Sequence, residues 1–121
     1  MTIQSDRPRE LAAFYSRLLR WPVYAEDPPE AGVTGWVQLR PPEGAVGFRL
    51  NFDPDPDYRA PVWPSAPGEQ QAMEHLDIEV DDLAAAVDWA LSVGARLAEH
   101  QPHDDVRICL DPAGHPFCLF T

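Results

Sequence analysis

Polar residues with catalytic or ligand-binding potential alternate along one short segment, residues 75–80. His75, Asp77 and Glu79 are separated there by single apolar residues. Successive side chains of a β-strand point to opposite faces, so these three groups would share one face. An imidazole that titrates near neutral pH could hydrogen-bond a small molecule or hold a metal ion. The structural alternative is a strand-end histidine that is hydrogen-bonded to a neighbour such as Glu74 or Asp77.

Two other segments show the same alternation. Within residues 46–52, it places Arg49 and Asn51 on the face opposite the apolar side chains. Within residues 117–120, it places Cys118 there. A guanidinium, an amide and a thiol add hydrogen-bonding groups to the imidazole and carboxylates. We expect these side chains to line one interior hollow.

Three aromatic residues are further candidates for ligand contact. Trp36 lies on a predicted strand, residues 35–39, and Tyr58 and Trp63 lie in a proline-rich connection. Small-molecule pockets are mostly apolar and aromatic, with a few directed polar groups. The alternative for all three is ordinary packing in the core or in a covering loop.

Several other clusters predict loops rather than sites. Residues 53–57 alternate Asp and Pro like the first half of a calcium-binding loop, but the required glycine and closing glutamate are missing. We expect an extended, solvated connection there. His100 and His103 belong to a polar turn, and His115 follows Gly114 in a tight turn, so local geometry accounts for each.

The first half of the chain, residues 1–52, predicts the order βαβββ. A strand at 2–4 precedes a helix with Asp6 as its cap and Pro8 in its first turn. Apolar residues then recur at helical spacing, and Arg20 occupies the helix end. Three β-like runs follow, at residues 23–26, 35–39 and 46–52.

The second half, residues 74–121, repeats that order. A strand at 75–80 precedes a helix with Asp82 as its cap and Gly94 at its end. The strands that follow are expected at residues 95–99, 106–110 and 117–120. Residues 53–73 connect the halves, and this segment could cover a cavity as a lid.

Charge and composition disfavour two classes of partner. The chain has 121 residues, nine arginines, no lysine and a net charge of −11. An acidic surface repels phosphate backbones and anionic lipid, so we expect neither nucleic-acid nor membrane partners. The start of the chain lacks the pattern of a secretory signal, which predicts a cytoplasmic protein with Cys109 and Cys118 as free thiols, although a cross-strand disulfide is an alternative.

The repeated helical segments, residues 75–80 and the closing run from Leu110 to Phe120 together resemble the vicinal oxygen chelate superfamily. The resemblance is to its glyoxalase-like, or bleomycin-resistance-like, proteins. It implies an α+β fold in which two tandem βαβββ modules form a curved mixed-sheet cup within a single domain, residues 1–121.

The resemblance also implies where a metal ion would bind. Metal-dependent members use four inward side chains, one from the first and one from the last strand of each module. Only His75 matches that pattern, because Asn51 and Cys118 stand at two of the other positions and the fourth falls at or before Met1. We therefore predict no metal cofactor, and His75 as the ligand if a divalent ion binds.

The resulting hypothesis is a protein that binds a small molecule in the cup between its sheets without a catalytic metal. The ligand would be an aromatic or cationic small molecule, and Asp77 and Glu79 favour the cationic one. One alternative is a metal-dependent lyase, isomerase or dioxygenase of the glyoxalase type. Another is an interaction module whose cup is filled by its own side chains. The resemblance implies a homodimer, with a cup formed either within one chain or between two.

Overall fold

The computed structural model describes all residues, 1–121, and divides the chain into two compact units. Unit 1 spans Met1–Tyr58 and unit 2 spans Arg59–Thr121. Each unit holds one four-stranded mixed sheet and one α-helix, in the order βαβββ. The predicted α+β fold with two tandem βαβββ modules is confirmed.

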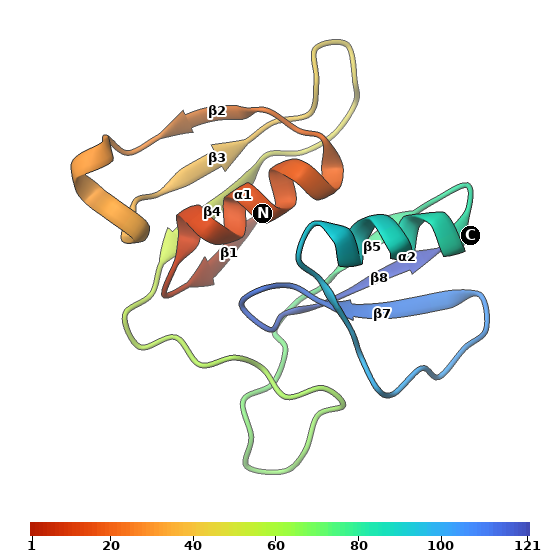
Figure 1. Ribbon diagram of the computed structural model, residues 1–121. Helices are drawn as coiled ribbons and strands as arrows, with labels where there is room; N and C mark the ends of the chain where they lie inside the picture. The colour runs from red at the N-terminus through yellow and green to blue at the C-terminus, as the bar shows by residue number, and fades with distance from the viewer. The chain divides into compact units, whose positions relative to one another are not determined.

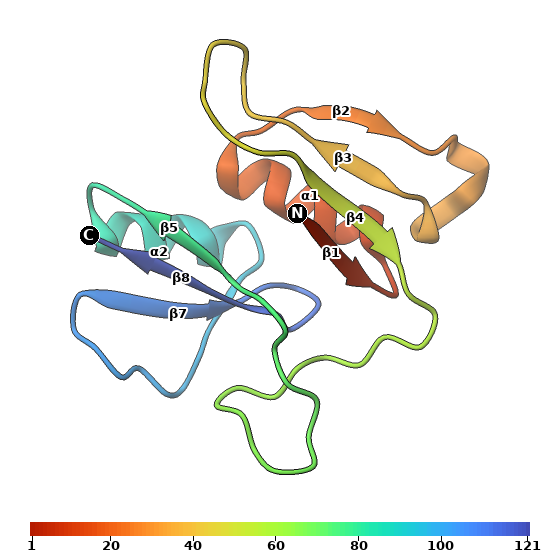
Figure 2. The ribbon, with the colours of Figure 1, turned by 180° about the vertical axis from the view of Figure 1, so that it is seen from behind.

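Unit 1 begins with strand β1 (Thr2–Ser5) and helix α1 (Pro8–Leu19). Strand β2 (Val23–Glu26), the short 3-10 helix η1 (Pro29–Thr34), strand β3 (Val37–Leu39) and strand β4 (Leu50–Pro54) follow. The sheet order is β1-β4-β3-β2, with β1 parallel to β4 and the other pairs antiparallel. Helix α1 lies in front of this sheet in Figure 1 and behind it in Figure 2.

Unit 2 has the same plan. It contains strand β5 (Leu76–Glu79), helix α2 (Leu83–Ser92), and strands β6 (Arg96–Leu97), β7 (Val106–Leu110) and β8 (Pro116–Phe120). The sheet order is β5-β8-β7-β6, again with one parallel pair, β5 and β8. Helix α2 lies against β7 and β8 (Figure 1).

The alternation of apolar residues gives each sheet a helix face and a far face, the side turned away from its helix. In unit 1, Leu50 and Phe52 are fully buried on the helix face, and Phe52 stacks on Tyr15 of α1 at 5.5 Å between ring centroids. In unit 2, Phe117 and Leu119 are buried while Cys118 between them is half-buried. Burial of these alternate positions fixes which residues remain for the far faces.

Some predicted boundaries are wrong. Arg7, rather than Asp6, is the cap residue of α1, and the Ser5 hydroxyl accepts the Arg7 backbone N–H at 3.2 Å. The strand expected at 46–52 is Leu50–Pro54, because residues 41–49 form a loop and the pairing with β1 continues to Pro54. The proline-rich connection therefore starts after residue 54. Strand β6 is only two residues long, whereas residues 95–99 were expected.

Two residues at helix ends have a positive φ, as predicted for Gly94. Arg20 adopts the left-handed conformation, with φ 55°, at the end of α1. Gly94 follows the last turn of α2 with φ 120°. No helix of the structure is long and apolar enough to cross a membrane.

The cap of α2 provides a test of the fold. The Asp82 carboxylate accepts the backbone N–H of Ala85 at 3.0 Å, which satisfies one of the unpaired donors of the first turn. Asp82→Ala should lower the free energy of unfolding by about 1 kcal/mol, measured by urea denaturation. Asp81→Ala, at the exposed neighbouring position, is the matched control and should change it by less than about 0.5 kcal/mol. Equal effects of the two substitutions would contradict the capping role.

Candidate functional site

The far face of unit 2 holds a cluster of three potential ligand groups, His75, Asp77 and Cys118. Asp77 of β5 pairs directly with Cys118 of β8, so their side chains share a face. The His75 Nε2 atom lies 3.3 Å from Asp77 Oδ1, and the three ligand atoms all lie within 4.8 Å of one another. The predicted orientation of these side chains, away from the helix, is confirmed within this unit. The position of His75 agrees with both hypotheses for this residue, contact with a ligand and pairing with a neighbour.

The Cys118 thiol keeps its proton at neutral pH. Burial raises its pKa to about 11, and the hydrogen bond to Asp77 and the charge of that carboxylate add to the effect. Its cross-strand partner Ile108 is buried, which accounts for an apolar neighbourhood on one side. A protonated thiol donates a weak hydrogen bond to the carboxylate and is a poor nucleophile.

The second thiol has no part in this cluster. Cys109 pairs with Phe117, whereas Cys118 pairs with Ile108, so the two sulfur atoms lie on opposite faces of the sheet. Both cysteines are free, as predicted. Burial alone raises the pKa of Cys109 to about 11.

The donor set of this cluster suits some metal ions better than others. An imidazole nitrogen, a carboxylate oxygen and a thiol sulfur suit a borderline ion such as Zn²⁺ or Co²⁺ better than Mn²⁺, which prefers oxygen ligands. A metal ion would have to displace the Cys118 proton. Three donors from one unit fit an ion that keeps an open coordination position.

The far face of unit 1 holds a row of polar side chains that sequence analysis largely missed. Gln38 of β3 pairs with Asn51 of β4, and its Nε2 donates to Asn51 Oδ1 at 2.8 Å. Arg40 donates from Nε to Gln38 Oε1 at 3.2 Å, and its guanidinium carbon lies 3.1 Å from the centroid of the Tyr24 ring. Alternation of Trp36, Gln38 and Arg40 with buried residues was the signal available in the sequence.

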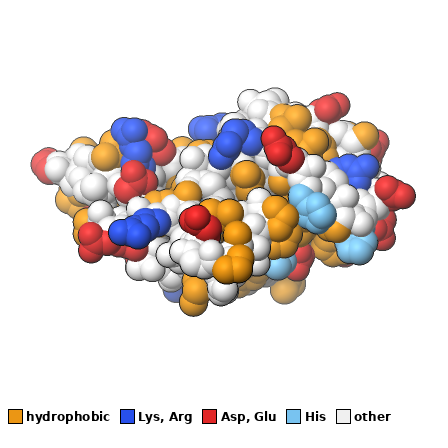
Figure 3. Space-filling model, turned by 90° about the horizontal axis from the view of Figure 1, so that it is seen from below, with side chains coloured by type: hydrophobic (Ala, Val, Ile, Leu, Met, Phe, Trp, Pro, Cys, Tyr) orange, Lys and Arg blue, Asp and Glu red, His pale blue; other side chains and the backbone are white.

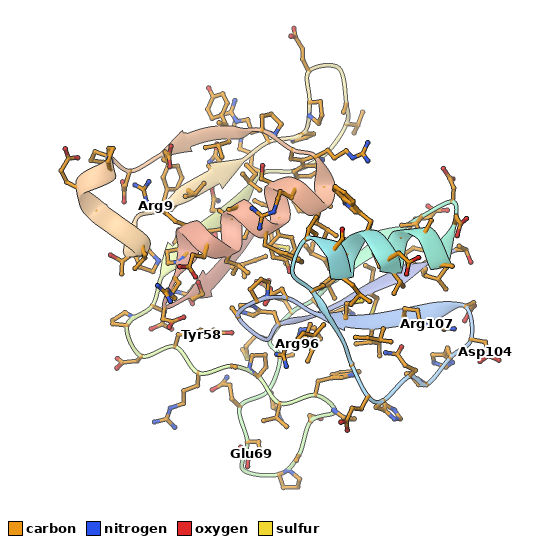
Figure 4. All side chains as sticks on the ribbon, viewed as in Figure 1. Arg9, Tyr58, Glu69, Arg96, Asp104 and Arg107 are labelled. Atoms are coloured by element: carbon orange, nitrogen blue, oxygen red, sulfur yellow. The ribbon has the colours of Figure 1, made fainter.

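The other predicted residues lie apart from these groups. Glu79 is exposed on β5, and Arg49 is exposed in the loop before β4. Trp36 is half-buried before β3, and its backbone N–H donates to Asp27 Oδ2 at 2.9 Å. Tyr58 lies in the connection after β4 (Figure 4). Trp63 belongs to the same connection. Asn51 belongs to unit 1 and His75 and Cys118 to unit 2, so their convergence in one cup stays a prediction.

Two further polar groups have structural roles. Asp111 is fully buried, accepts the backbone N–H groups of Ala113 and His115, and lies 2.9 Å from His115 Nδ1. These contacts define the turn between β7 and β8, as predicted for His115.

In Figure 3, the arginine side chains lie in separate groups with acidic side chains among them.

The contact between Asp77 and Cys118 predicts how fast the Cys118 thiol reacts at different pH values. Because its pKa is about 11, only about a thousandth of Cys118 is thiolate at pH 8. In a Cys109→Ala background, iodoacetamide should alkylate Cys118 slowly at pH 8 and faster as the pH approaches 11. Asp77→Asn removes a charge that opposes the thiolate and should shift this profile to lower pH. Glu79→Gln, two residues along the same strand, is the control; an equal shift there, or none with Asp77→Asn, would contradict the contact.

Several solved structures are similar in fold to this chain. A glyoxalase family protein from Enterococcus faecalis has 18% identity and a TM-score of 0.69, over 100% of this chain and 94% of that one. TnmS3, an antibiotic binding protein from Streptomyces sp. CB03234, has 18% identity and a TM-score of 0.58, over 99% and 90%. A mutant of the fosfomycin resistance protein FosX from Listeria monocytogenes, complexed with Mn(II) and a phosphonic acid, has 9% identity and a TM-score of 0.70, over 99% and 87%.

These structures share the fold of the chain. No curated protein sequence matches it. The family model of the glyoxalase-like domain matches residues 1–120, which is nearly the whole chain. The chain therefore belongs to the glyoxalase-like domain family.

Proposed function

We propose that this protein binds a small organic molecule through the far faces of its sheets and does so without a catalytic metal. The observation that carries the proposal is the distribution of polar groups: each helix face is packed with apolar side chains, and each far face bears an ordered polar cluster. Half-buried polar groups such as Gln38, Asn51 and Cys118 are costly unless they are paired or serve a ligand. His75 and Asp77, in contrast, are exposed and can reach a bound molecule.

Relatives of similar fold support a binding role. The antibiotic binding protein TnmS3 and a glyoxalase/bleomycin resistance protein from the same Streptomyces strain share this architecture. Because one fold supports many different activities, the ligand of this chain has to be inferred from its own site residues. Within unit 2, that site is the His75, Asp77 and Cys118 cluster.

The three side chains of the cluster contact one another, so none of them needs a metal ion as a partner. Asp77 accepts from the Cys118 thiol and lies within reach of the His75 imidazole. Its negative charge is therefore engaged by two neighbours before any ligand arrives. The imidazole is exposed, so its outer edge can donate to or accept from a bound molecule.

A ligand panel tests this proposal. Quenching of the four tryptophans, titrated with aromatic carboxylates, phosphonates, amides and amines, should identify at least one compound that saturates. His75→Gln should weaken that compound by about tenfold, the size expected for one hydrogen bond to a charged group. His100→Gln, at an exposed loop position, is the matched control and should bind normally. A flat response across all four compound classes would contradict the proposal.

A metal-dependent activity of the glyoxalase type is the second candidate function. The observation in its favour is the convergence of three different donor atoms within 4.8 Å. The fold relative FosX is described with Mn(II), whereas the thiol of this chain favours a softer ion. Should a metal bind, His75, Asp77 and Cys118 would hold it, and the ion would supply Lewis-acid polarisation of a substrate oxygen.

Cobalt titration distinguishes the two candidates. If the cluster binds a metal, added Co²⁺ should produce a thiolate-to-cobalt charge-transfer band, with one proton released from Cys118 per ion and tighter binding at higher pH. Cys118→Ser should abolish the band and Cys109→Ser should keep it. Elemental analysis of protein purified without chelator gives the native occupancy. Absence of the band in the unmodified protein would exclude this second candidate at these residues.

A further inference from the structure

The guanidinium of Arg40 is held from two directions on the far face of unit 1. Its Nε atom donates to Gln38 Oε1 at 3.2 Å, and the Tyr24 ring lies beneath it at 3.1 Å from guanidinium carbon to ring centroid. We propose that Tyr24, Gln38 and Arg40 form a binding site for the carboxylate or phosphonate group of a small organic molecule. This inference rests on the proposed small-molecule binding and names the chemical class of the ligand.

The contacts of Arg40 leave its binding edge available. Arginine has five N–H donors, and the one on Nε is the only one that a side chain of this protein engages. Both terminal nitrogens, with their four N–H donors, have no protein partner. This edge matches two oxygens of a carboxylate or phosphonate in a fork-like pair. Stacking on Tyr24 and the Nε hydrogen bond orient that edge before a ligand arrives, which lowers the entropic cost of binding.

Other arginines of the chain with defined contacts have structural roles. The terminal nitrogens of Arg9 donate to one carboxylate and two backbone carbonyls, and Arg107 donates from Nη1 to three carbonyls at the start of β7 (Figure 4). Arg7 pairs with Glu10. Arg40 is paired with no carboxylate, although the chain has 20 acidic residues and nine arginines. An ordered, half-buried guanidinium without a counter-ion attracts an external anion.

The backbone supports the position of all three residues. Ala25 pairs with Gln38 and Val23 with Leu39, so Tyr24 is the extra residue of a bulge in β2. The bulge turns the Tyr24 ring towards Arg40, which continues the alternation that places Gln38 on the far face. Gln38 is itself fixed by its amide hydrogen bond to Asn51.

The surroundings favour an organic anion over a simple inorganic ion. Tyr24 is 58% exposed, and the loop that follows Arg40 carries Phe48, which is 50% exposed and meets the Trp21 ring edge-on at 6.0 Å. Exposed aromatic surface beside an oriented guanidinium is the composition of a site for a molecule with an apolar body and one charged group. The far face of unit 1 also carries Asp53 on β4, and no ion pair joins it to Arg40.

Titration of isotope-labelled protein tests the inference directly. The probes are benzoate, phenylphosphonate and inorganic phosphate, with neutral benzamide and cationic benzylamine as matched compounds. The arginine Nε–Hε signals are followed by nuclear magnetic resonance. Benzoate or phenylphosphonate should shift the Arg40 signal and saturate, and the compound that binds more tightly identifies the preferred anionic group. Inorganic phosphate should bind at least tenfold more weakly than phenylphosphonate.

Variants show whether anion affinity depends on the paired N–H donors of Arg40 or only on its positive charge. Arg40→Lys keeps the positive charge but loses the planar pair of donors, and should weaken the tighter anion by about tenfold or more. Gln38→Leu should weaken it less, by about threefold, because it removes only the alignment. Arg59→Lys, at an exposed position without such contacts, should leave affinity unchanged. The Arg40 signal of the unmodified protein provides a readout that does not depend on the folding of any variant.

The outcomes separate this inference from the proposed function. Binding of benzamide or benzylamine as tight as that of the anions, or anion binding insensitive to Arg40→Lys, would overturn the anion site and leave small-molecule binding standing. Equal affinity for inorganic phosphate and phenylphosphonate would overturn the organic character of the ligand. Failure of every probe to bind would overturn the anion site, and the broader panel then decides the proposed function independently.

Discussion

The strict alternation of side chains across each four-stranded sheet is the constraint on which the rest of this structure depends. Once Leu50 and Phe52 pack beneath α1, the position between them has to face away from the helix, and that position is Asn51. The same argument places Cys118 between Phe117 and Leu119 in unit 2. A slip of one residue would bury an amide or expose two large apolar side chains, so burial of the helix face also specifies the far face.

Polar groups on the far faces are stabilised mainly by one another. Asp77 is the centre of its cluster because it accepts from Cys118 and lies 3.3 Å from His75 Nε2. In unit 1, Gln38 has the central place, since its amide donates to Asn51 while its carbonyl accepts from Arg40. Such connected groups lose little further freedom when a ligand binds, which is the physical meaning of a preorganised site.

The face of the sheet on which a side chain lies could be predicted from the sequence, because it depends only on the alternation of neighbouring residues. His75, Asp77, Asn51 and Cys118 were therefore placed correctly relative to their own helices. The row that includes Tyr24 and Arg40 could not be, because it depends on a bulge in β2 and on register between strands distant in sequence. The cap of α1 was misplaced by one residue: Arg7 is the cap, no side chain caps the first turn, and the Ser5 hydroxyl at the end of β1 accepts the backbone N–H of Arg7 instead.

Comparison of the two units shows how one backbone plan supports different chemistry. Asn51 pairs with Thr2 across β1 and β4, and Cys118 pairs with Asp77 across β5 and β8, so the two pairs occupy corresponding places. The pair in unit 1 is uncharged, and Gln38, which donates to Asn51, also accepts from the Arg40 guanidinium. In unit 2, burial raises the pKa of the thiol to about 11, and the paired carboxylate adds to the effect. The repeat therefore keeps apolar packing beneath both helices while the polar groups of the far faces differ: a carboxylate is central in unit 2, and an amide that holds an arginine is central in unit 1.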